Sequence, residues 1–461
     1  MSGPKIGFVT CVHPIYDLPS VAQHRDAAVA GLQAEGCRVI AVPIARDPKA
    51  VAEIAALLKQ EQIDLLVLFF CTWVAEEITL GLAHALDEVP LFLWALPYFD
   101  RSIPMPSPMT GLTATGCNIR RAGRSFVHHV GEPTAEHVGV VARAARVAAE
   151  VRGLRRARFG MVGSQCPGML DTICDESLLE KRLGITVVHY DLESLLRVRD
   201  ESSAEEAAAL ARGLMARVGS CEVPLETVAE QYRLYLGMKA IVETDRLDGF
   251  SVRCWPELRD RHKTTICLTM AEMAEAGTPS ACEADLTALV TAYVLSRLSG
   301  QPSYSLEITA LLQEENALQF AHCGSAAPSL AGGAANVSVR GHMRTGAGAL
   351  MEFGFKPGRV TIAKLLRPDG GTPRIFLARG EVIPTAAGTR GSVATVRVEP
   401  SPREFLDAML WHAVEHHLVL VYGDWSADVR QFAQFAGMEV IGAGSSGTGT
   451  GAARVEGGGR H

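Results

Sequence analysis

Apolar residues in the first hundred positions gather in short runs, separated by segments with helical spacing. The runs are rich in β-branched and aromatic residues, and the segments between them, such as 48–60 and 75–86, are rich in alanine and glutamate. Strands that alternate with helices of this length form right-handed crossovers in a parallel sheet. The pattern therefore predicts an α/β lobe built on KIGFVTCV, CRVIAVPIA, DLLVLFFCTW and VPLFLWALP.

The alternation of strands and helices begins again after a long helix predicted over 134–154. The strand RARFGMVGSQ follows, and helical and strand patterns then alternate to about residue 276. Ser203 and Glu206 have capping-box spacing at the start of a predicted helix, 204–217. This segment predicts a second α/β lobe.

Beyond about residue 330 the chain is rich in glycine, threonine, valine and arginine. Short alternating runs with turn signals such as PDGG predict an antiparallel sheet or a small barrel. We therefore predict an α/β protein with two Rossmann-like lobes that contain parallel sheets, 1–155 and 156–297, followed by a β-rich, barrel-like C-terminal domain, 298–461. From about residue 443 the chain is rich in glycine and serine, which predicts a disordered tail.

Composition narrows the classes of partner. The 461 residues carry a net charge of −7 without a basic block, which argues against nucleic acid or an anionic membrane as the principal partner. The most apolar run, LLVLFFCTWV, has ten residues and is too short to span a bilayer. Eleven cysteines without CxxC spacing, and a start without a charged and then apolar leader, predict a cytoplasmic protein.

Two glutamates stand out in the core-like segment 282–312. Glu283 begins a predicted helix, 283–298, and acids at helix N-termini are common for electrostatic reasons, an explanation that applies equally to Asp285. Glu307 lies on the polar face of a predicted strand, and that face meets either solvent or a site. A buried carboxylate needs a cation, a network of donors or a proton.

Three histidines add to these carboxylates. His322 ends a predicted strand just before a turn at Gly324, and His416 and His417 stand at the head of the run LVLVYG. A single histidine beside a strand is usually structural. Two carboxylates with imidazoles, however, form a donor set that suits Mn²⁺ and related ions, whereas the cysteines lack the spacing of a structural zinc site.

Other motifs are less specific. Trp73 and Trp255 follow strands at the carboxyl edges of the two predicted sheets, where open α/β folds place ligands, although packing in the core is the simpler explanation for both. The glycine-containing GMVGSQCPG is not a GxGxxG motif, so the sequence does not favour dinucleotide binding.

A series of motifs, in order along nearly the whole chain, resembles the L-fucose isomerase and L-arabinose isomerase superfamily, above all its L-fucose isomerase-like members. This resemblance implies two Rossmann-like lobes and a β-rich C-terminal domain, with Mn²⁺ as the cofactor of an aldose–ketose isomerase. The motifs are IGFVTCVHPIYD, RFGMVGSQCPGM, CWPEL, CEADLTALVTAYVLSRLSGQP, HCG, FKPGRVTIAKL and HHLVLVYGD.

The resemblance also assigns roles to individual residues. It implies that Glu283 and Glu307 bind the metal and form the candidate acid/base pair, and that His322 and His417 complete the metal ligands, with His416 as the alternative to His417. Two further residues are implied to bind substrate: Trp73 lies near the sugar, and His13 reaches into the site of a neighbouring subunit. A homo-oligomer with shared sites follows, with a hexamer among the options.

The expected function is metal-dependent isomerisation of a free pentose, a hexose or a modified hexose (6-deoxy or 6-sulfo) through a cis-enediol, with a hydride shift as the competing mechanism. The alternative from another class is a non-catalytic sugar-binding or sensor protein of the same fold. For a sulfonated or phosphorylated sugar, Arg120, Arg121 and Arg124 are candidate anion ligands, although a solvated basic loop explains them as well.

Overall fold

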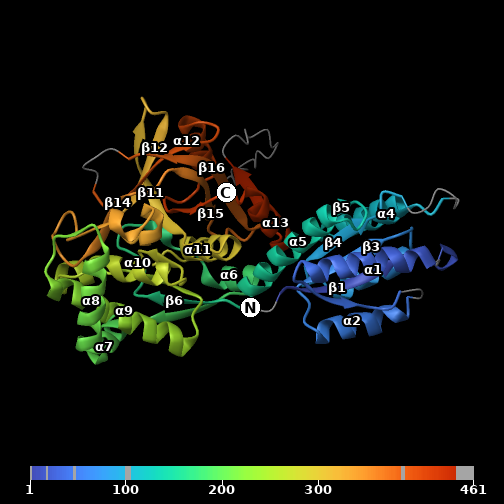
Figure 1. Ribbon diagram of the computed structural model, residues 1–461, viewed down its shortest axis with the longest axis horizontal. Helices are drawn as coiled ribbons and strands as arrows, with labels where there is room; N and C mark the ends of the chain where they lie inside the picture. Colours follow the sequence, from blue (N-terminus) through green and yellow to red (C-terminus); the bar gives the residue numbers. More distant parts are fainter. Residues whose placement is uncertain (1–2, 17–18, 45–47, 99–104, 386–389, 443–461) are drawn as a thin grey trace, which may run out of the picture.

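The computed structural model describes residues 3–16, 19–44, 48–98, 105–385 and 390–442. It confirms the predicted α/β class, with two parallel sheets and a larger mixed sheet in the C-terminal region (Figure 1). The tail predicted from about residue 443 lies outside the described residues. No described helix is long and apolar enough to cross a membrane.

The first sheet is parallel and has the strand order β2-β1-β3-β4-β5. Every residue of β3 and β4 is buried, because helices cover both faces of the sheet centre. The elements are β1 Lys5–Cys11, α1 Pro19–Ala34, β2 Arg38–Ala41, α2 Ala50–Gln60, β3 Leu65–Phe70, α3 Glu76–Ala85, β4 Leu91–Ala95, α4 Pro108–Arg121 and β5 Val127–Val130.

The second sheet is parallel as well, with the order β10-β9-β6-β7. The Ser203 hydroxyl accepts a hydrogen bond of 3.1 Å from the Glu206 backbone N–H, which confirms the predicted cap. The elements are β6 Arg158–Val162, α6 Glu176–Leu183, β7 Thr186–Tyr190, α7 Leu192–Glu201, α8 Ala204–Arg217, α9 Leu225–Asp245, β9 Gly249–Val252, α10 Cys267–Glu275, β10 Ser280–Cys282 and α11 Leu286–Ser299.

The third sheet has ten strands, and pairing between β16 and β17 closes six of them into a barrel of order β16-β15-β18-β11-β12-β17. The barrel-like prediction is thus confirmed, while the domain boundaries stay predictions. The elements are β8 Ser220–Cys221, β11 Tyr304–Leu312, β12 Ala317–His322, β13 Ser338–Arg340, β14 Leu350–Gly354, β15 Gly358–Leu365, β16 Arg374–Ile383, β17 Ser392–Val398, α12 Pro402–Trp411, β18 Leu418–Tyr422, α13 Ser426–Ala436 and β19 Glu439–Gly442.

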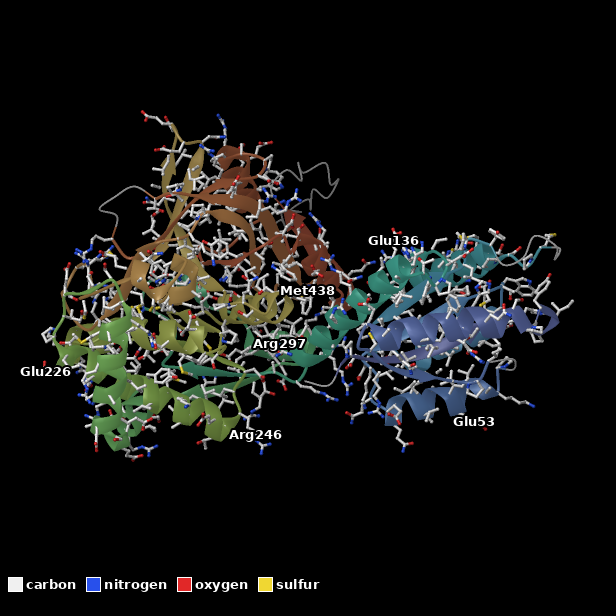
Figure 2. The ribbon with its side chains drawn as sticks, viewed as in Figure 1. Glu53, Glu136, Glu226, Arg246, Arg297 and Met438 are labelled. Carbon is white, nitrogen blue, oxygen red and sulfur yellow. The ribbon has the colours of Figure 1, made fainter. Side chains whose placement is uncertain are left out.

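Helix α5, Ala135–Leu154, joins the first lobe to the rest of the molecule. It packs on α1 and the first sheet, and also contacts α11 and α13. Figures 1 and 2 show it running from the first lobe to the junction with the other two sheets, where Arg297 and Met438 lie. Buried residues of α5 and α13 belong to one continuous apolar cluster, so the lobes share part of a core.

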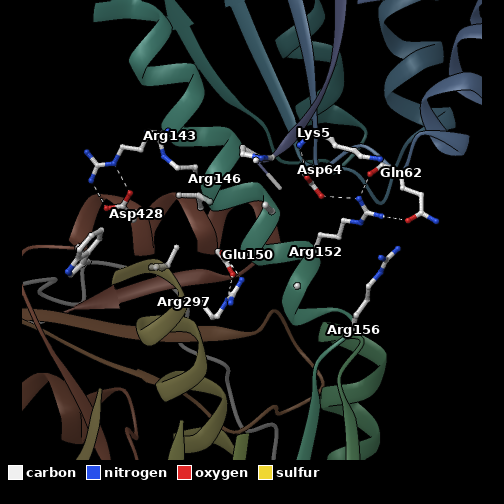
Figure 3. Close-up of a pocket in the computed structure, with 17 residues that line it drawn as sticks. Lys5, Gln62, Asp64, Arg143, Arg146, Glu150, Arg152, Arg156, Arg297 and Asp428 are labelled. Atoms are coloured by element: carbon white, nitrogen blue, oxygen red, sulfur yellow. Dashed lines mark hydrogen bonds and ion pairs between the residues drawn. The ribbon is translucent and has the colours of Figure 1, made fainter. Parts of the chain in front are cut away.

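A cavity of about 840 Å³, rich in arginine, lies beside α5 at this junction (Figure 3). Its arginines are largely engaged by carboxylates of other elements. The Arg143 guanidinium holds both oxygens of Asp428 at the start of α13, and Arg297 at the end of α11 donates to Glu150 at 2.7 Å. These ion pairs tie α5 to α11, which follows the last strand of the second sheet, and to α13, which connects β18 and β19 of the third.

We expect Arg143→Met to lower the free energy of unfolding by about 1–3 kcal/mol, because the Asp428 carboxylate, 5% exposed, loses its charged donors. Arg146→Met is the matched control on the same helix. Its nearest acid, Glu35, is 4.0 Å away and both side chains are about half exposed, so a change within about 0.5 kcal/mol is expected. Urea unfolding followed by circular dichroism measures both, and equal losses would contradict the role of Arg143.

Candidate active site

A cavity of about 490 Å³ lies between the carboxyl edge of the second sheet and barrel strands β11, β12 and β17. Glu283, Glu307 and His322 all line it. Open α/β sheets bind ligands at this edge, because successive strands end there and the loops that follow them converge. The structure therefore brings together three of the four predicted metal ligands, which are up to 39 positions apart in sequence.

Glu283 follows β10 directly, and the expectation that it lies in the first turn of a helix is wrong. Helix α11 begins only at Leu286, with Asp285 as its N-cap. Glu283 and Ala284 have φ values of 64° and 57°, in the left-handed region, which costs roughly 1–2 kcal/mol for each such residue. Because of this sharp turn, Glu283 lies outside the helix, and the chain is directed so that Asp285 can cap α11.

Glu307 lies on β11 and pairs with Ala321 of β12, the residue that directly precedes His322. It is half-buried and faces the cavity, so the polar strand face predicted from the sequence meets the candidate site. His322 ends β12, as predicted, and its Nδ1 accepts a hydrogen bond of 2.9 Å from the Cys323 backbone N–H.

His417 occupies the centre of the group and is completely buried. Its Nδ1 lies 3.0 Å from Asp285 Oδ2, and its ring centroid is 5.3 Å from that of His322. Its Nε2 lies 3.2 Å from Glu283 Oε2 but makes no hydrogen bond within the part of the chain that the structure describes. A buried imidazole that a carboxylate orients through one nitrogen, and that has no hydrogen bond at the other, matches a metal-ligating histidine.

His416 is the neighbouring alternative. Its Nδ1 lies 2.6 Å from Asp171 Oδ2, and its Nε2 is 3.9 Å from Glu283 Oε2. Possible ligand atoms of Glu283, His416 and His417 lie within 4.8 Å of one another. A second such group overlaps with the first through Glu283 and consists of Cys282, Glu283 and His322. Glu283 is thus the residue shared by both potential donor groups.

Asp285 and Lys364 form a buried ion pair behind His417. Both side chains are 0% exposed, and Lys364 Nζ donates to Asp285 Oδ2 at 2.8 Å. The other oxygen of Asp285 accepts from the Ala288 backbone N–H at 2.8 Å. From the sequence, Asp285 was expected only to be an acid at a helix N-terminus, and Lys364 was not a candidate. A lysine inside the apolar strand run VTIAKL was the available signal.

The histidines keep the Glu283 carboxylate ionised. Burial alone would raise its pKa, but the close approach of His416 and His417 and the charge of His322 together lower the pKa well below its ordinary range. Asp285 behaves in the same way: burial raises its pKa, and the charge of Lys364 and the contacts with His417 lower it further than burial raises it. Both carboxylates are therefore anionic at neutral pH.

The negative charges of the site also change the pKa of His322. Burial would lower its pKa, but the contact with the Cys323 side chain and the charges of Cys323, Glu283 and Glu307 raise it to about 10. The site is therefore suited to a cation.

Trp255 lines the cavity, so this candidate from the sequence lies at the site. Its indole Nε1 is buried and has no acceptor among the described residues, which leaves one N–H donor for a ligand. Trp73 does not line this cavity and stacks on His13 at the carboxyl edge of the first sheet, with centroids 4.3 Å apart. The substrate-binding roles of His13 and Trp73 stay predictions.

The basic cluster Arg120, Arg121 and Arg124 lies at the end of α4 in the first lobe, away from the cavity. Arg124 donates to the Leu86 carbonyl at 2.9 Å. Its guanidinium therefore supports the α3–α4 region, and the basic residues that line the cavity come from other segments.

Comparison with known proteins confirms the resemblance to sugar isomerases and the prediction that the chain is an isomerase enzyme. No family model matches the chain. The chain is 23% identical over 387 residues to a sulfoquinovose isomerase from Priestia aryabhattai, covering 83% of this chain and 86% of that protein. It is 25% identical over 356 residues to a sulfoquinovose isomerase from Clostridium sp. (strain MSTE9), covering 76% and 80%.

A third relative, a sulfoquinovose isomerase from Alkalicoccus urumqiensis, is 24% identical over 364 residues, covering 77% of this chain and 80% of that protein. Among solved structures, a periplasmic solute-binding protein of an ABC transporter from Actinobacillus succinogenes, with bound D-allose, is 13% identical over 65% of this chain and 92% of that chain. Its TM-score is 0.17. A likeness this weak does not favour the sugar-binding alternative.

We expect Lys364→Met to lower the free energy of unfolding by about 3–5 kcal/mol, because Asp285 would stay buried without its cation. Lys356→Met is the control in the same domain. The Lys356 side chain is exposed and its Nζ lies 4.8 Å from the Tyr422 ring centroid, so the change should stay within about 1 kcal/mol. Urea unfolding tests both, and a loss below about 1 kcal/mol for Lys364→Met would refute the importance of the pair.

Proposed function

We propose that the chain is a divalent-metal-dependent aldose–ketose isomerase, and that its substrate is a hexose with a sulfonate at C6. The observation that carries the proposal is that Glu283, Glu307 and His322 line one cavity, while His417 lies behind it with its Nε2 3.2 Å from Glu283 Oε2. The relatives named sulfoquinovose isomerase support a modified hexose as the substrate.

These four side chains would hold the cation, with Mn²⁺ as the proposed metal. They fit such an ion because Glu283 is anionic and because His417 Nε2 is buried and oriented by Asp285. Carboxylate and imidazole donors suit Mn²⁺. When bound, the cation would polarise the sugar carbonyl and neutralise charge that develops on the neighbouring oxygens.

The proton transfer is assigned to a glutamate. The base removes the proton from C2 of the open-chain aldose, the C–H electron pair forms the C1–C2 double bond, and O1 gains a proton. The cis-enediol then loses its O2 proton as C2 becomes the carbonyl, and the base returns a proton to C1. Glu307 is the proposed base, since Glu283 is engaged by His416 and His417 whereas Glu307 has no hydrogen bond to a described side chain.

We also propose that neighbouring subunits complete each site. His13 and Trp73 stack on one another at the edge of the first sheet, and Trp73 is 36% exposed. Because neither residue lines the cavity of its own chain, this aromatic pair would contact a sugar in the site of a neighbouring chain. Mixing inactive Trp73→Ala protein with inactive Glu283→Gln protein should then restore part of the activity. If the mixed subunits do not regain activity, the result would count against active sites that are shared between neighbouring subunits.

We propose a cytoplasmic location as well. All eleven cysteines lie in the described part of the chain and are free thiols, as expected in a reducing compartment.

The test of the proposed function is a panel of aldoses and ketoses, including 6-deoxy and 6-sulfo hexoses, incubated in D₂O with metal-stripped protein, with and without Mn²⁺. We expect interconversion of a 6-sulfo aldose–ketose pair only with Mn²⁺, and NMR should detect deuterium at C1 or C2 because the transferred proton exchanges with solvent. Turnover without deuterium would favour a hydride shift. Mn²⁺ binding without turnover of any sugar would contradict the isomerase and favour a sugar-binding protein.

Glu283→Gln and Glu307→Gln should each lower kcat by at least about 100-fold, since general acid–base catalysis contributes roughly 10²–10⁴-fold. If Glu307 is the base, Glu307→Gln should also abolish deuterium exchange, even at a Mn²⁺ concentration high enough to saturate the variant. Glu314→Gln, in the exposed turn of the same hairpin, is the matched control and should retain normal turnover. Near-normal turnover of Glu307→Gln would exclude it as the base.

Substitution of the two adjacent histidines identifies the ligand. His417→Asn should weaken Mn²⁺ binding by at least about 100-fold, because loss of an outer-shell partner alone typically costs 10–100-fold. His416→Asn should change the affinity by less than about tenfold, since its Nε2 lies 3.9 Å from Glu283 Oε2, compared with 3.2 Å for His417. Isothermal titration calorimetry measures both. The reverse order would assign the ligand to His416.

A further inference from the structure

We propose that Arg344 is the specificity-determining residue of the cavity, and that it binds the anionic group of the sugar at the end opposite to the reacting carbons. This inference rests on the proposed function and names the contact that selects a sulfonated substrate over a neutral one. It follows from the pairing of the charged side chains that line the cavity, and from the loop that carries Arg344.

Three arginines line the cavity, and two of them are paired with carboxylates. Arg259 donates from Nε to Asp260 Oδ1 at 2.7 Å, with its guanidinium carbon 5.3 Å from the Trp255 ring centroid. Arg390 donates from Nε to Glu352. The charges of these two arginines are therefore largely offset by their own partners.

Arg344 differs from the other two arginines. Its side chain is exposed and makes no ion pair or hydrogen bond with any residue in the described ranges, although it lines the same cavity. Glu283 and Glu307 are the two remaining lining carboxylates, and a divalent cation would balance them. Arg344 is then the lining arginine without a carboxylate partner among the described residues, and its guanidinium can bind the negative charge of a sulfonate.

The loop that carries Arg344 is held in place by its own hydrogen bonds. His342 is 7% exposed, and its backbone N–H donates to the Ala347 carbonyl at 3.0 Å. The Gly346 N–H donates to the His342 carbonyl at 2.7 Å, and the Arg344 N–H donates to His342 Nδ1 at 3.4 Å. A guanidinium on such a loop loses less conformational freedom on binding than one on an unrestrained loop.

The same loop approaches the metal-binding residues closely. Gly391, with φ of 86°, lies between this loop and His322. A Cβ added at Gly391 would lie 3.0 Å from the His322 carbonyl oxygen and 3.1 Å from Met343 Cε. Met343 directly precedes Arg344, so the loop and His322 border the same cavity. A hexose with C1 and C2 at Glu283, Glu307 and His322 can therefore direct C6 toward Arg344.

The test uses two linear alditols that cannot isomerise because they lack a carbonyl: 6-deoxy-6-sulfoglucitol and neutral 6-deoxyglucitol. Their binding to the Mn²⁺-loaded full-length protein is measured by isothermal titration calorimetry. We expect Arg344→Gln to weaken binding of the sulfonated alditol roughly 10- to 150-fold, the range for loss of hydrogen bonds to a charged group. Binding of the neutral alditol and of Mn²⁺ should stay within about twofold. Arg344→Lys should recover part of the loss.

Arg261→Gln is the matched control, because it removes the same charge from an exposed residue that does not line the cavity, and both alditols should then bind as to the wild-type protein. Equal losses for the two alditols in Arg344→Gln, or no loss, would overturn the inference, as would failure of the wild-type protein to bind the sulfonated alditol. If the wild-type protein binds the sulfonated alditol through Arg344 but turns over no sugar, the inference is upheld and the isomerase activity is rejected.

Discussion

The buried Asp285 carboxylate is the constraint on which the site depends. It caps α11, accepts from Lys364 and orients His417, so one side chain fixes a helix start, a barrel strand and an imidazole. Such a charge is costly to remove from water unless its oxygens are fully engaged, and here both are. A single desolvated anion therefore sets the positions of groups from three distant parts of the chain. Just before Asp285, the left-handed turn of Glu283 and Ala284 directs the Glu283 side chain toward the cavity.

The sequence was sufficient for most of the fold. Alternating strand and helix patterns predicted both parallel sheets, because period and turn residues are local properties of the chain. The barrel followed from short alternating strands, although its closure through β16 and β17 is a long-range pairing that no local pattern encodes. Helix α11 was expected to start at Glu283, because acid-rich helix starts look alike in sequence and the left-handed turn of Glu283 and Ala284 carries no glycine to signal it.

The candidate site was found in part for the same reason. Glu283, Glu307 and His322 could be selected because each is a polar residue at the edge of an apolar element. Lys364 could not be paired with Asp285, since 79 positions separate them and only the packed barrel brings them to 2.8 Å. Arg344 lacked a signal altogether: an arginine in a glycine-rich loop is ordinary, and its significance lies in the partners that its neighbours Arg259 and Arg390 have and it does not.

Closure of the barrel divides the site into two parts with different local stability. Glu307, His322 and Lys364 lie on strands of this closed ring, and each of them pairs with a residue of a neighbouring strand, so opening at these positions requires part of the barrel ladder to open. The loop of Arg344 has only its own short-range bonds and can open alone. Two of the proposed donors for the cation, Glu307 and His322, thus belong to the barrel ladder, while the group that meets the far end of a ligand can rearrange without disturbing them.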